Sequence, residues 1–415
     1  MEAIVHLSPF RALAPRCNWD YTRRFAALGR LVSKKLTAPL RRTKSAVDCK
    51  LLIFPGVHVA EAGTIDAARQ EEFVGKVVEQ ISGTMTTLLG AIGDRLGLFK
   101  NLAEQGPATS AELASRTEMN ERYLREWLGG MATAGYVNYD GSTKRFSLPV
   151  EHASVLAQEN GPFFVGGMYQ MLPAFTSVFD GVLTAFRSGG GVSQSHYNDM
   201  MWDGLERFSS TWFENLLLQQ WIPAMPDVKA LLERGCDVAD VGCGRGRGLI
   251  KLAEAFPRSR YVGYDNFGKT IARATANARE AGVSDRVRFE ERDVSKGLPA
   301  QFDVITTFDV VHDAVDPLEL LQSIRRALRP GGVYVCLDIN CSDKLEENAN
   351  PLGAMFHGVS VFYCMTTSLA NHGAGLGTLG FHEAKVRELC NKAGFSSVRR
   401  VPLENPFNNL YEAKP

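Results

Sequence analysis

From residue 231 onward, short apolar runs alternate with segments in which apolar positions recur every three to four residues. Short apolar runs favour buried strands, and the longer periodic segments favour helices. Strands that alternate with helices form a parallel sheet covered on both faces. Residues 231–415 therefore predict an α/β domain. Its strands are expected over residues 238–241, 261–265, 286–290, 302–307 and 333–337.

The pattern differs over residues 66–150. Apolar positions at helical spacing predict a helix over 70–103, and a short helix follows that Thr109 or Ser110 can cap. After a third helical segment, Asp140-Gly141 separates two β-prone segments, as in a tight hairpin. Three helices followed by a hairpin is the order of a winged helix. A mostly α winged-helix domain is therefore expected to precede the α/β domain.

Residues 151–230 are helical in pattern and rich in aromatic residues. Aromatic side chains at helical spacing most often pack into a core, and this interpretation is preferred for most of them. A denser group near the start of the segment is a candidate wall for an apolar ligand. It comprises Phe163, Phe164, Met168, Tyr169, Met171 and Phe175. We expect a helical connector that also serves as a substrate lid.

The distribution of charge argues against nucleic acid as a partner. The 415 residues carry 46 Lys and Arg against 46 Asp and Glu, and residues 81–150 carry seven of each sign. Because phosphate contacts need a basic face, DNA binding by the winged helix is disfavoured. Its many apolar helical positions favour dimerisation instead, so a homodimer joined through the N-terminal domain is expected.

The N-terminal segment and the cysteines bear on the compartment. Residues 1–65 form a basic leader, which is either a mitochondrial transit peptide or a solvated tail. No apolar run is long enough to span a bilayer, and the eight cysteines are scattered, as in a reducing compartment. The cytoplasm is expected, with the mitochondrial matrix as the alternative. No Cys/His group has zinc spacing, so no metal site is expected.

The clearest candidate for chemistry is a glycine-rich loop after the first strand, Gly242-Cys243-Gly244-Arg245-Gly246. Glycines allow a tight turn and let a ligand approach the backbone, although such a loop alone also fits a dinucleotide. Asp265 ends the second strand, where a carboxylate can accept both ribose hydroxyls. Asp293 follows the third strand, where a carboxylate can accept from an adenine amino group. Each acid alone could cap a helix or form a turn, but their joint spacing favours a nucleoside ligand.

In these motifs the C-terminal domain resembles the class I S-adenosylmethionine (SAM)-dependent methyltransferases. Their first motif matches residues 238–248. Their ribose acid matches Asp265 and their adenine acid matches Asp293. The Leu-Arg-Pro-Gly-Gly turn at 328–332 is typical of the same family. The resemblance covers residues 231–415 and implies SAM as cofactor. It also implies a Rossmann-like seven-stranded sheet that ends in an antiparallel edge pair.

The N-terminal half is similar to the winged-helix modules of small-molecule O-methyltransferases and of a little-characterised bacterial group. The resemblance implies that the glycine loop, the two acids and the end of the fourth strand contact the cofactor. The expected cofactor-binding residues are Asp240, Gly242, Cys243, Gly244, Gly246, Asp265, Asn266, Asp293, Val294, Phe308 and Asp309.

His312 is the preferred candidate for a general base, with Asp313 beside it as a second catalytic candidate. His312 follows the fourth strand, where open parallel sheets place reactive loops. Its imidazole side chain titrates near neutral pH, as a general base should. The alternative is that either residue only caps the next helix. A hydroxyl acceptor usually needs a base, whereas a neutral amine does not. We expect methyl transfer to a small, apolar or aromatic acceptor; the alternative is a non-catalytic SAM-binding or scaffold protein.

Overall fold

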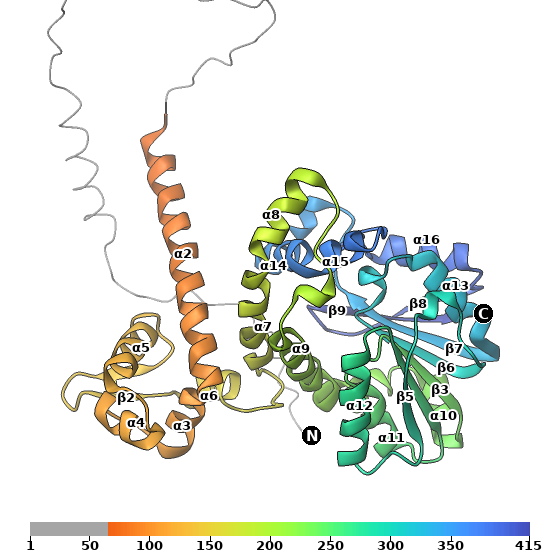
Figure 1. Ribbon diagram of the computed structural model, residues 1–415, viewed down its shortest axis with the longest axis horizontal. Helices are drawn as coiled ribbons and strands as arrows, with labels where there is room; N and C mark the ends of the chain where they lie inside the picture. Colours follow the sequence, from red (N-terminus) through yellow and green to blue (C-terminus); the bar gives the residue numbers. More distant parts are fainter. Residues whose placement is uncertain (1–64) are drawn as a thin grey trace, which may run out of the picture. The chain divides into compact units, whose positions relative to one another are not determined.

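The computed structural model describes residues 65–415 (Figure 1). The predicted leader, with its transit-peptide interpretation, therefore lies outside the described residues apart from Ile65. Within the described part, no helix is both long enough and apolar enough to cross a membrane.

The C-terminal half contains a seven-stranded sheet in the order β5-β4-β3-β6-β7-β9-β8. Neighbouring strands from β5 to β7 run parallel, whereas β9 pairs antiparallel with both β7 and β8. This arrangement confirms the predicted Rossmann-like fold and its antiparallel edge pair. The strands are β3 (Asp237–Val241), β4 (Arg260–Asp265), β5 (Val287–Glu291), β6 (Phe302–Phe308), β7 (Leu328–Ile339), β8 (Ser397–Val401) and β9 (Asn408–Lys414).

Helices cover both faces of this sheet because successive strand residues are buried on opposite sides (Figure 1). Val238 and Val304 pack into one cluster, and their neighbours Ala239 and Ile305 pack into the other. The first cluster also receives α10 (Pro226–Arg234), α11 (Arg247–Ala255) and α12 (Gly268–Glu280). The second receives α13 (Pro317–Ala327) and α16 (Glu383–Ala393).

The described residues up to β2 form the predicted winged helix. Thr109 forms a capping box with Glu112, and β1 and β2 pair as the expected hairpin. The predicted helix over 70–103 is wrong in one respect, because it is two helices separated at Gly97, which has a φ of 67°. A left-handed glycine ends a helix, but the apolar spacing continues past it and hides the break. The elements are α2 (Ala67–Arg95), α3 (Leu98–Gln105), α4 (Ser110–Thr117), α5 (Glu121–Thr133), β1 (Asn138–Asp140) and β2 (Arg145–Ser147).

The connector is helical, as predicted, and its two central helices cross closely. A Cβ atom on Gly167 would lie 2.5 Å from the backbone nitrogen of Phe208, and one on Gly204 would lie 2.5 Å from Met171 Cγ. These glycines therefore allow α7 and α9 to approach each other. The elements are α6 (Val150–Leu156), α7 (Gly166–Ser177), α8 (Phe179–Ser188), the 3₁₀ turn η1 (Gln194–His196), α9 (Asp199–Trp212) and its π-helical continuation η2 (Phe213–Trp221).

Short helical segments complete the domain. Several lie between β7 and α16, and others follow β5 and β6. They are η3 (Val294–Lys296), η4 (Val311–Asp313), η5 (Leu345–Asn348), α14 (Pro351–Val359), the π-helical η6 (Ser360–Cys364) and α15 (Met365–Ala370).

Candidate cofactor and acceptor site

A cavity of about 390 Å³ lies where the carboxyl ends of β3, β4 and β6 meet. The order of the sheet reverses at β3, which has β4 on one side and β6 on the other. Open α/β sheets bind ligands at such a switch point. One part of the cavity is lined by polar groups of the glycine loop and strand ends, and another by apolar side chains of the connector.

The glycine loop is fixed by the end of β4. The backbone nitrogens of Gly242 and Cys243 donate to the Tyr264 carbonyl at 2.8 and 3.0 Å. Gly242 has a φ of 69°, and a Cβ atom there would lie 2.5 Å from Val310. Glycine at this position therefore meets both a conformational and a steric requirement.

Asp265 contacts the glycine loop and also lines the cavity. Its Oδ2 accepts from the Gly244 backbone nitrogen at 3.0 Å, and its Oδ1 accepts from the Phe267 nitrogen at 2.9 Å. Burial raises the pKa of this carboxyl, although these backbone donors oppose the effect. Each carboxylate oxygen can accept a second hydrogen bond, so ligand hydroxyls can still donate to Asp265.

His312 lies on η4 at another wall of the cavity and is buried. Its Nδ1 is 2.6 Å from Oδ1 of Asp338, and its Nε2 is 3.2 Å from Oδ1 of Asp313. Burial alone would lower the pKa of His312, but the charges of Asp338 and Asp313 raise it well above its ordinary value. Burial and the nearby Asp338 raise the pKa of Asp309 to about 8.

Comparison with known proteins assigns two segments of the chain to families. Residues 232–394 match the family described as a methyltransferase domain, and residues 84–158 match the Rv2258c-like winged HTH domain. The chain contains a class I SAM-dependent methyltransferase domain preceded by a winged-helix domain. SAM is accordingly its cofactor, as the sequence predicted.

Individual relatives agree with this assignment. A ubiquinone biosynthesis O-methyltransferase of Pseudomonas syringae pv. tomato is 31% identical over 144 residues, which cover 34% of this chain and 59% of that protein. Its counterpart in Roseobacter denitrificans is 31% identical over 27% of this chain and 44% of its own length. The chain thus matches about half the length of these curated relatives.

Solved structures show the same fold over most of the chain. Human N-acetylserotonin methyltransferase, solved in complex with SAM, has a TM-score of 0.63 and 16% identity, covering 85% of this chain and 99% of that one. An O-methyltransferase family protein from Burkholderia thailandensis has a TM-score of 0.62 and 17% identity, covering 82% and 97%.

Most of the predicted site residues line the cavity at the carboxyl ends of β3, β4 and β6. They are Asp240, Gly242, Cys243, Gly244, Asp265, Asn266, Phe308, Asp309, His312 and Asp313. The buried carboxyl of Asp240 and the half-buried carboxylate of Asp265 suit a cationic ligand such as SAM, and Asp265 has acceptor capacity for its ribose. The residues present therefore fit the cofactor.

Three predicted cofactor residues do not line this cavity. Gly246 is the N-cap of α11, with the Phe289 ring in the position where a Cβ would lie. Asp293 is exposed and accepts from the backbone and hydroxyl of Ser295, as its turn-forming alternative expects, and its contact with adenine stays a prediction. Val294 packs into the hydrophobic core. Because these three residues do not line the cavity, its geometry gives no support for a contact between them and SAM.

Asp338 is a site residue that the sequence analysis missed. It lies one residue before the end of β7 and is buried. The available signal was a single acid within the apolar run Val-Tyr-Val-Cys-Leu-Asp-Ile over residues 333–339. Because a charged side chain in a buried strand needs a partner, that acid pointed to a basic group at the same sheet edge.

The apolar part of the cavity comes mainly from the connector and from segments after β7. Of the predicted lid group, Met168, Met171 and Phe175 line it, whereas Phe163 is exposed. Phe164 packs against Arg207 and Tyr169 approaches Tyr136, both outside the cavity. Further apolar lining residues are Met201, Trp202, Leu205, Phe208, Trp212, Phe213, Met355, Phe356, Tyr363 and Phe407.

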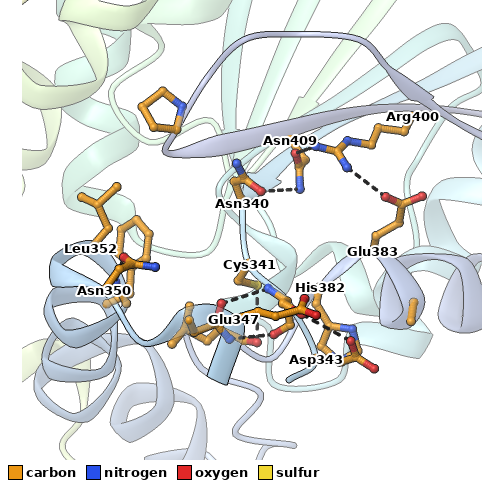
Figure 2. A pocket seen from close by; sticks show the side chains of 17 residues that line it. Asn340, Cys341, Asp343, Glu347, Asn350, Leu352, His382, Glu383, Arg400 and Asn409 are labelled. Atoms are coloured by element: carbon orange, nitrogen blue, oxygen red, sulfur yellow. Dashed lines mark hydrogen bonds and ion pairs between the residues drawn. The ribbon is translucent and has the colours of Figure 1, made fainter. Parts of the chain in front are cut away.

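A second cavity, of about 570 Å³, contains none of the predicted site residues (Figure 2). Its lining is mostly polar, and several of the polar side chains already form hydrogen bonds with one another. Arg400 donates to Asn409 Oδ1 at 2.7 Å and to Glu383 at 3.2 Å, and Asn409 donates to Asn340 Oδ1 at 3.1 Å. We therefore place the cofactor in the first cavity.

Glu206 of α9 ties the connector to the cofactor loop. It accepts from Arg245 Nη1 at 2.8 Å, from Arg247 Nε at 2.7 Å and from Asn277 Nδ2 at 2.9 Å. Burial would raise the pKa of Glu206, but these donors lower it below its ordinary value. The adjacent Arg207 binds Asp94 of α2 at 2.8 Å. α9 therefore connects the winged-helix domain to the glycine loop.

Glu206→Gln is expected to weaken SAM binding about 3- to 10-fold. Losing a buried hydrogen bond to a charged group costs about 1.5–3 kcal/mol, and only part of that cost lowers the affinity for SAM, because the bond holds the loop and does not contact the ligand. Calorimetric titration with SAM measures the effect. Glu214→Gln is the matched control, since its carboxylate on η2 pairs with Lys251 instead of the loop. Equal SAM affinity of Glu206→Gln and wild type would show that α9 does not organise the loop.

Proposed function

We propose that this protein transfers the methyl group of SAM to a hydroxyl of a small, apolar or aromatic acceptor, with His312 as general base. The observation that carries the proposal is the shared cavity. Its lining includes the loop that fits SAM, the imidazole of His312 and a set of aromatic and Met side chains. The matched relatives named as O-methyltransferases support oxygen as the acceptor atom.

The contacts of His312 suit the role of a base. In its neutral form with the proton on Nδ1, the imidazole donates to Asp338, and its Nε2 lone pair can accept the acceptor's proton. Because Asp338 and Asp313 raise the pKa of His312, the fraction of this neutral form, and with it turnover, should increase as the pH rises. Asp338 would fix the ring and its tautomer, and it is thus a positioning residue. Both groups are buried, which limits their alternative orientations.

When bound, SAM supplies a methyl group that its sulfonium already activates. The protein's own task is then to bind the acceptor, orient its hydroxyl, exclude water and remove the proton. The aromatic walls would bind a planar or aliphatic acceptor by burying apolar surface. An aromatic pair at the junction of α9 and α12, Trp202 and Phe267, has ring centroids 4.8 Å apart.

An acceptor screen tests this proposal. Phenols, quinols, fatty acids and amines are incubated with the full-length protein and radiolabelled SAM, and organic-extractable label is counted. Turnover of hydroxylated aromatic or apolar compounds is expected. Label transferred only to protein or RNA would contradict the proposal, and tight SAM binding without any turnover would favour the non-catalytic alternative.

SAM affinity is expected to rise with pH between about 6 and 8. Burial raises the pKa of Asp240 to about 7, against an ordinary value of 3.8. A carboxyl beside a cationic ligand binds it better when ionised, so below pH 7 binding must first release a proton. The dissociation constant should fall up to tenfold per pH unit below pH 7, and Asp309 in the same cavity, with a pKa of about 8, should extend a shallower fall above it. Titration calorimetry measures it; a flat wild-type profile would contradict the role of Asp240, and Asp240→Asn should lose the dependence below pH 7 and keep only the part that Asp309 contributes.

We also propose that the protein forms a homodimer through α2. This 29-residue helix exposes an apolar stripe that recurs every three to four residues. A second copy could bury it by antiparallel or parallel pairing about a two-fold axis, as in most homodimers. The stripe comprises Phe73, Val77, Ile81, Met85, Leu88 and Ile92.

Ile81→Asp with Met85→Asp should convert the dimer to a monomer, because each buried apolar side chain contributes about 1.5–3 kcal/mol. Light scattering after size exclusion measures the mass. Glu79→Lys with Gln80→Lys, on the same helix, is the control. A monomeric wild type at micromolar concentration would contradict the proposal.

A further inference from the structure

We propose that His312, Asp313 and Cys364 form a binding site for Zn²⁺ at the acceptor end of the cavity. Their imidazole nitrogen, carboxylate oxygen and thiol sulfur all lie within 4.8 Å of one another. Nitrogen, oxygen and thiolate sulfur are the donors that zinc prefers in proteins, and a mixed set of this kind disfavours Mg²⁺ and Ca²⁺. Two of the residues lie on η4, and Cys364 is the last residue of η6.

The spacing of the donors suits one ion. Nε2 of His312 and Oδ1 of Asp313 are 3.2 Å apart. Two ligands about 2.1 Å from a tetrahedral zinc ion are about 3.4 Å apart, so this pair already has nearly the required separation. The same Oδ1 atom is buried and, apart from its ion pair with a protonated His312 ring, has no hydrogen-bond partner among the described residues. A cation would satisfy it.

The surroundings also have the form of a metal site. Oδ1 of Asp338 lies 2.6 Å from Nδ1 of His312. Zinc-bound histidines characteristically donate the N–H of their second ring nitrogen to a carboxylate in this way. All three donors line the cavity. Three protein ligands would leave the fourth position of the ion open to water or to the acceptor, as in other zinc sites with an exchangeable position.

The site has no signature in the sequence. His312 and Asp313 are neighbours, but Cys364 lies far along the chain and reaches them through the segments after β7. The proposal therefore departs from the expectation of no metal site, which rested on spacing alone. The fold supplies the proximity that spacing could not reveal.

Zinc at this site would inhibit methyl transfer. The ion takes the Nε2 lone pair that the base needs, and binding releases the thiol proton of Cys364, with any proton on Nε2, to solvent. This consequence rests on the proposed role of His312, whereas the binding itself does not. Metal binding and turnover are therefore measured separately.

Co²⁺ is the probe, because a cobalt–thiolate bond gives a near-ultraviolet charge-transfer band that oxygen and nitrogen ligands do not give. The full-length, metal-free protein is titrated without SAM. One equivalent should produce the band, and excess Zn²⁺ should remove it. Cys364→Ser should abolish the band, and Asp313→Asn should weaken binding at least tenfold. Cys236→Ser is the matched control, since that half-buried thiol contacts Ser259 instead.

Absence of the band in wild type, or its persistence in Cys364→Ser, would overturn the site. Persistence would place the metal on another thiol of the chain. Circular dichroism of Cys364→Ser verifies that this near-isosteric variant folds. Inhibition of turnover by Zn²⁺ with the affinity measured by cobalt displacement supports the regulatory consequence. Zinc bound at the site without inhibition would contradict that consequence and the base role of His312, and it would leave the binding site intact.

Discussion

His312→Gln is expected to slow methyl transfer about 10²- to 10⁴-fold, the range that a positioned general base contributes. Glutamine retains a polar side chain of similar length but cannot take the hydroxyl proton. SAM affinity should change less than about twofold, because the ribose acid and the glycine loop are untouched. Steady-state turnover at saturating SAM and calorimetric SAM binding together separate the two effects.

His357→Gln is the control for that experiment, since His357 is an exposed histidine on α14. It should retain wild-type turnover. Asp338→Asn should lower the turnover number more than it raises KM, because it disturbs the orientation of the base and leaves the apolar walls intact. Turnover of His312→Gln within about threefold of wild type would contradict general-base catalysis by this residue.

Asp265→Ala is expected to weaken SAM binding by about 1–3 kcal/mol, or about 5- to 150-fold in Kd. The substitution removes an acceptor for ribose hydroxyls. It also releases the backbone nitrogens of Gly244 and Phe267, which the carboxylate now holds at 3.0 and 2.9 Å. Titration calorimetry with SAM and with S-adenosylhomocysteine measures the loss.

Asp293→Ala provides a discriminating comparison, because sequence and structure disagree about this acid. Its carboxylate caps η3 outside the cavity, so we expect less than a twofold change in SAM affinity. A loss equal to that of Asp265→Ala would restore Asp293 as an adenine ligand. Unchanged affinity of Asp265→Ala would contradict the placement of the cofactor at the end of β4.

The features that the sequence predicted well are those that local rules determine. Alternation of apolar runs and helices located the strands of the sheet within about a residue or two at each end, except that β7 begins at Leu328, well before the expected residue 333. The capping box of Thr109 and the tight loop after β3 follow from backbone requirements that few residue types meet. Asp265 was predicted to lie beside the glycine loop because it ends the strand that pairs parallel with the first strand, and it does contact Gly244 of that loop.

The features that the sequence did not reveal depend on contacts between distant segments. Asp338 acquires its role only when β7 lies beside β6, which brings its carboxylate to His312. Cys364 reaches the same group from η6. Spacing alone cannot distinguish a ligand from a cap at Asp293. In the structure Ser295 donates to its carboxylate, and the adenine contact stays a prediction.

The most direct test of the central claim follows transfer of tritiated methyl from SAM to the best acceptor of the screen. Wild type, His312→Gln and Asp265→Ala are compared under single-turnover conditions, with SAM binding measured on the same samples. The account predicts labelled acceptor with wild type, loss of transfer with retained SAM binding in His312→Gln, and loss of SAM affinity in Asp265→Ala. Wild-type rates of transfer in both variants would contradict it.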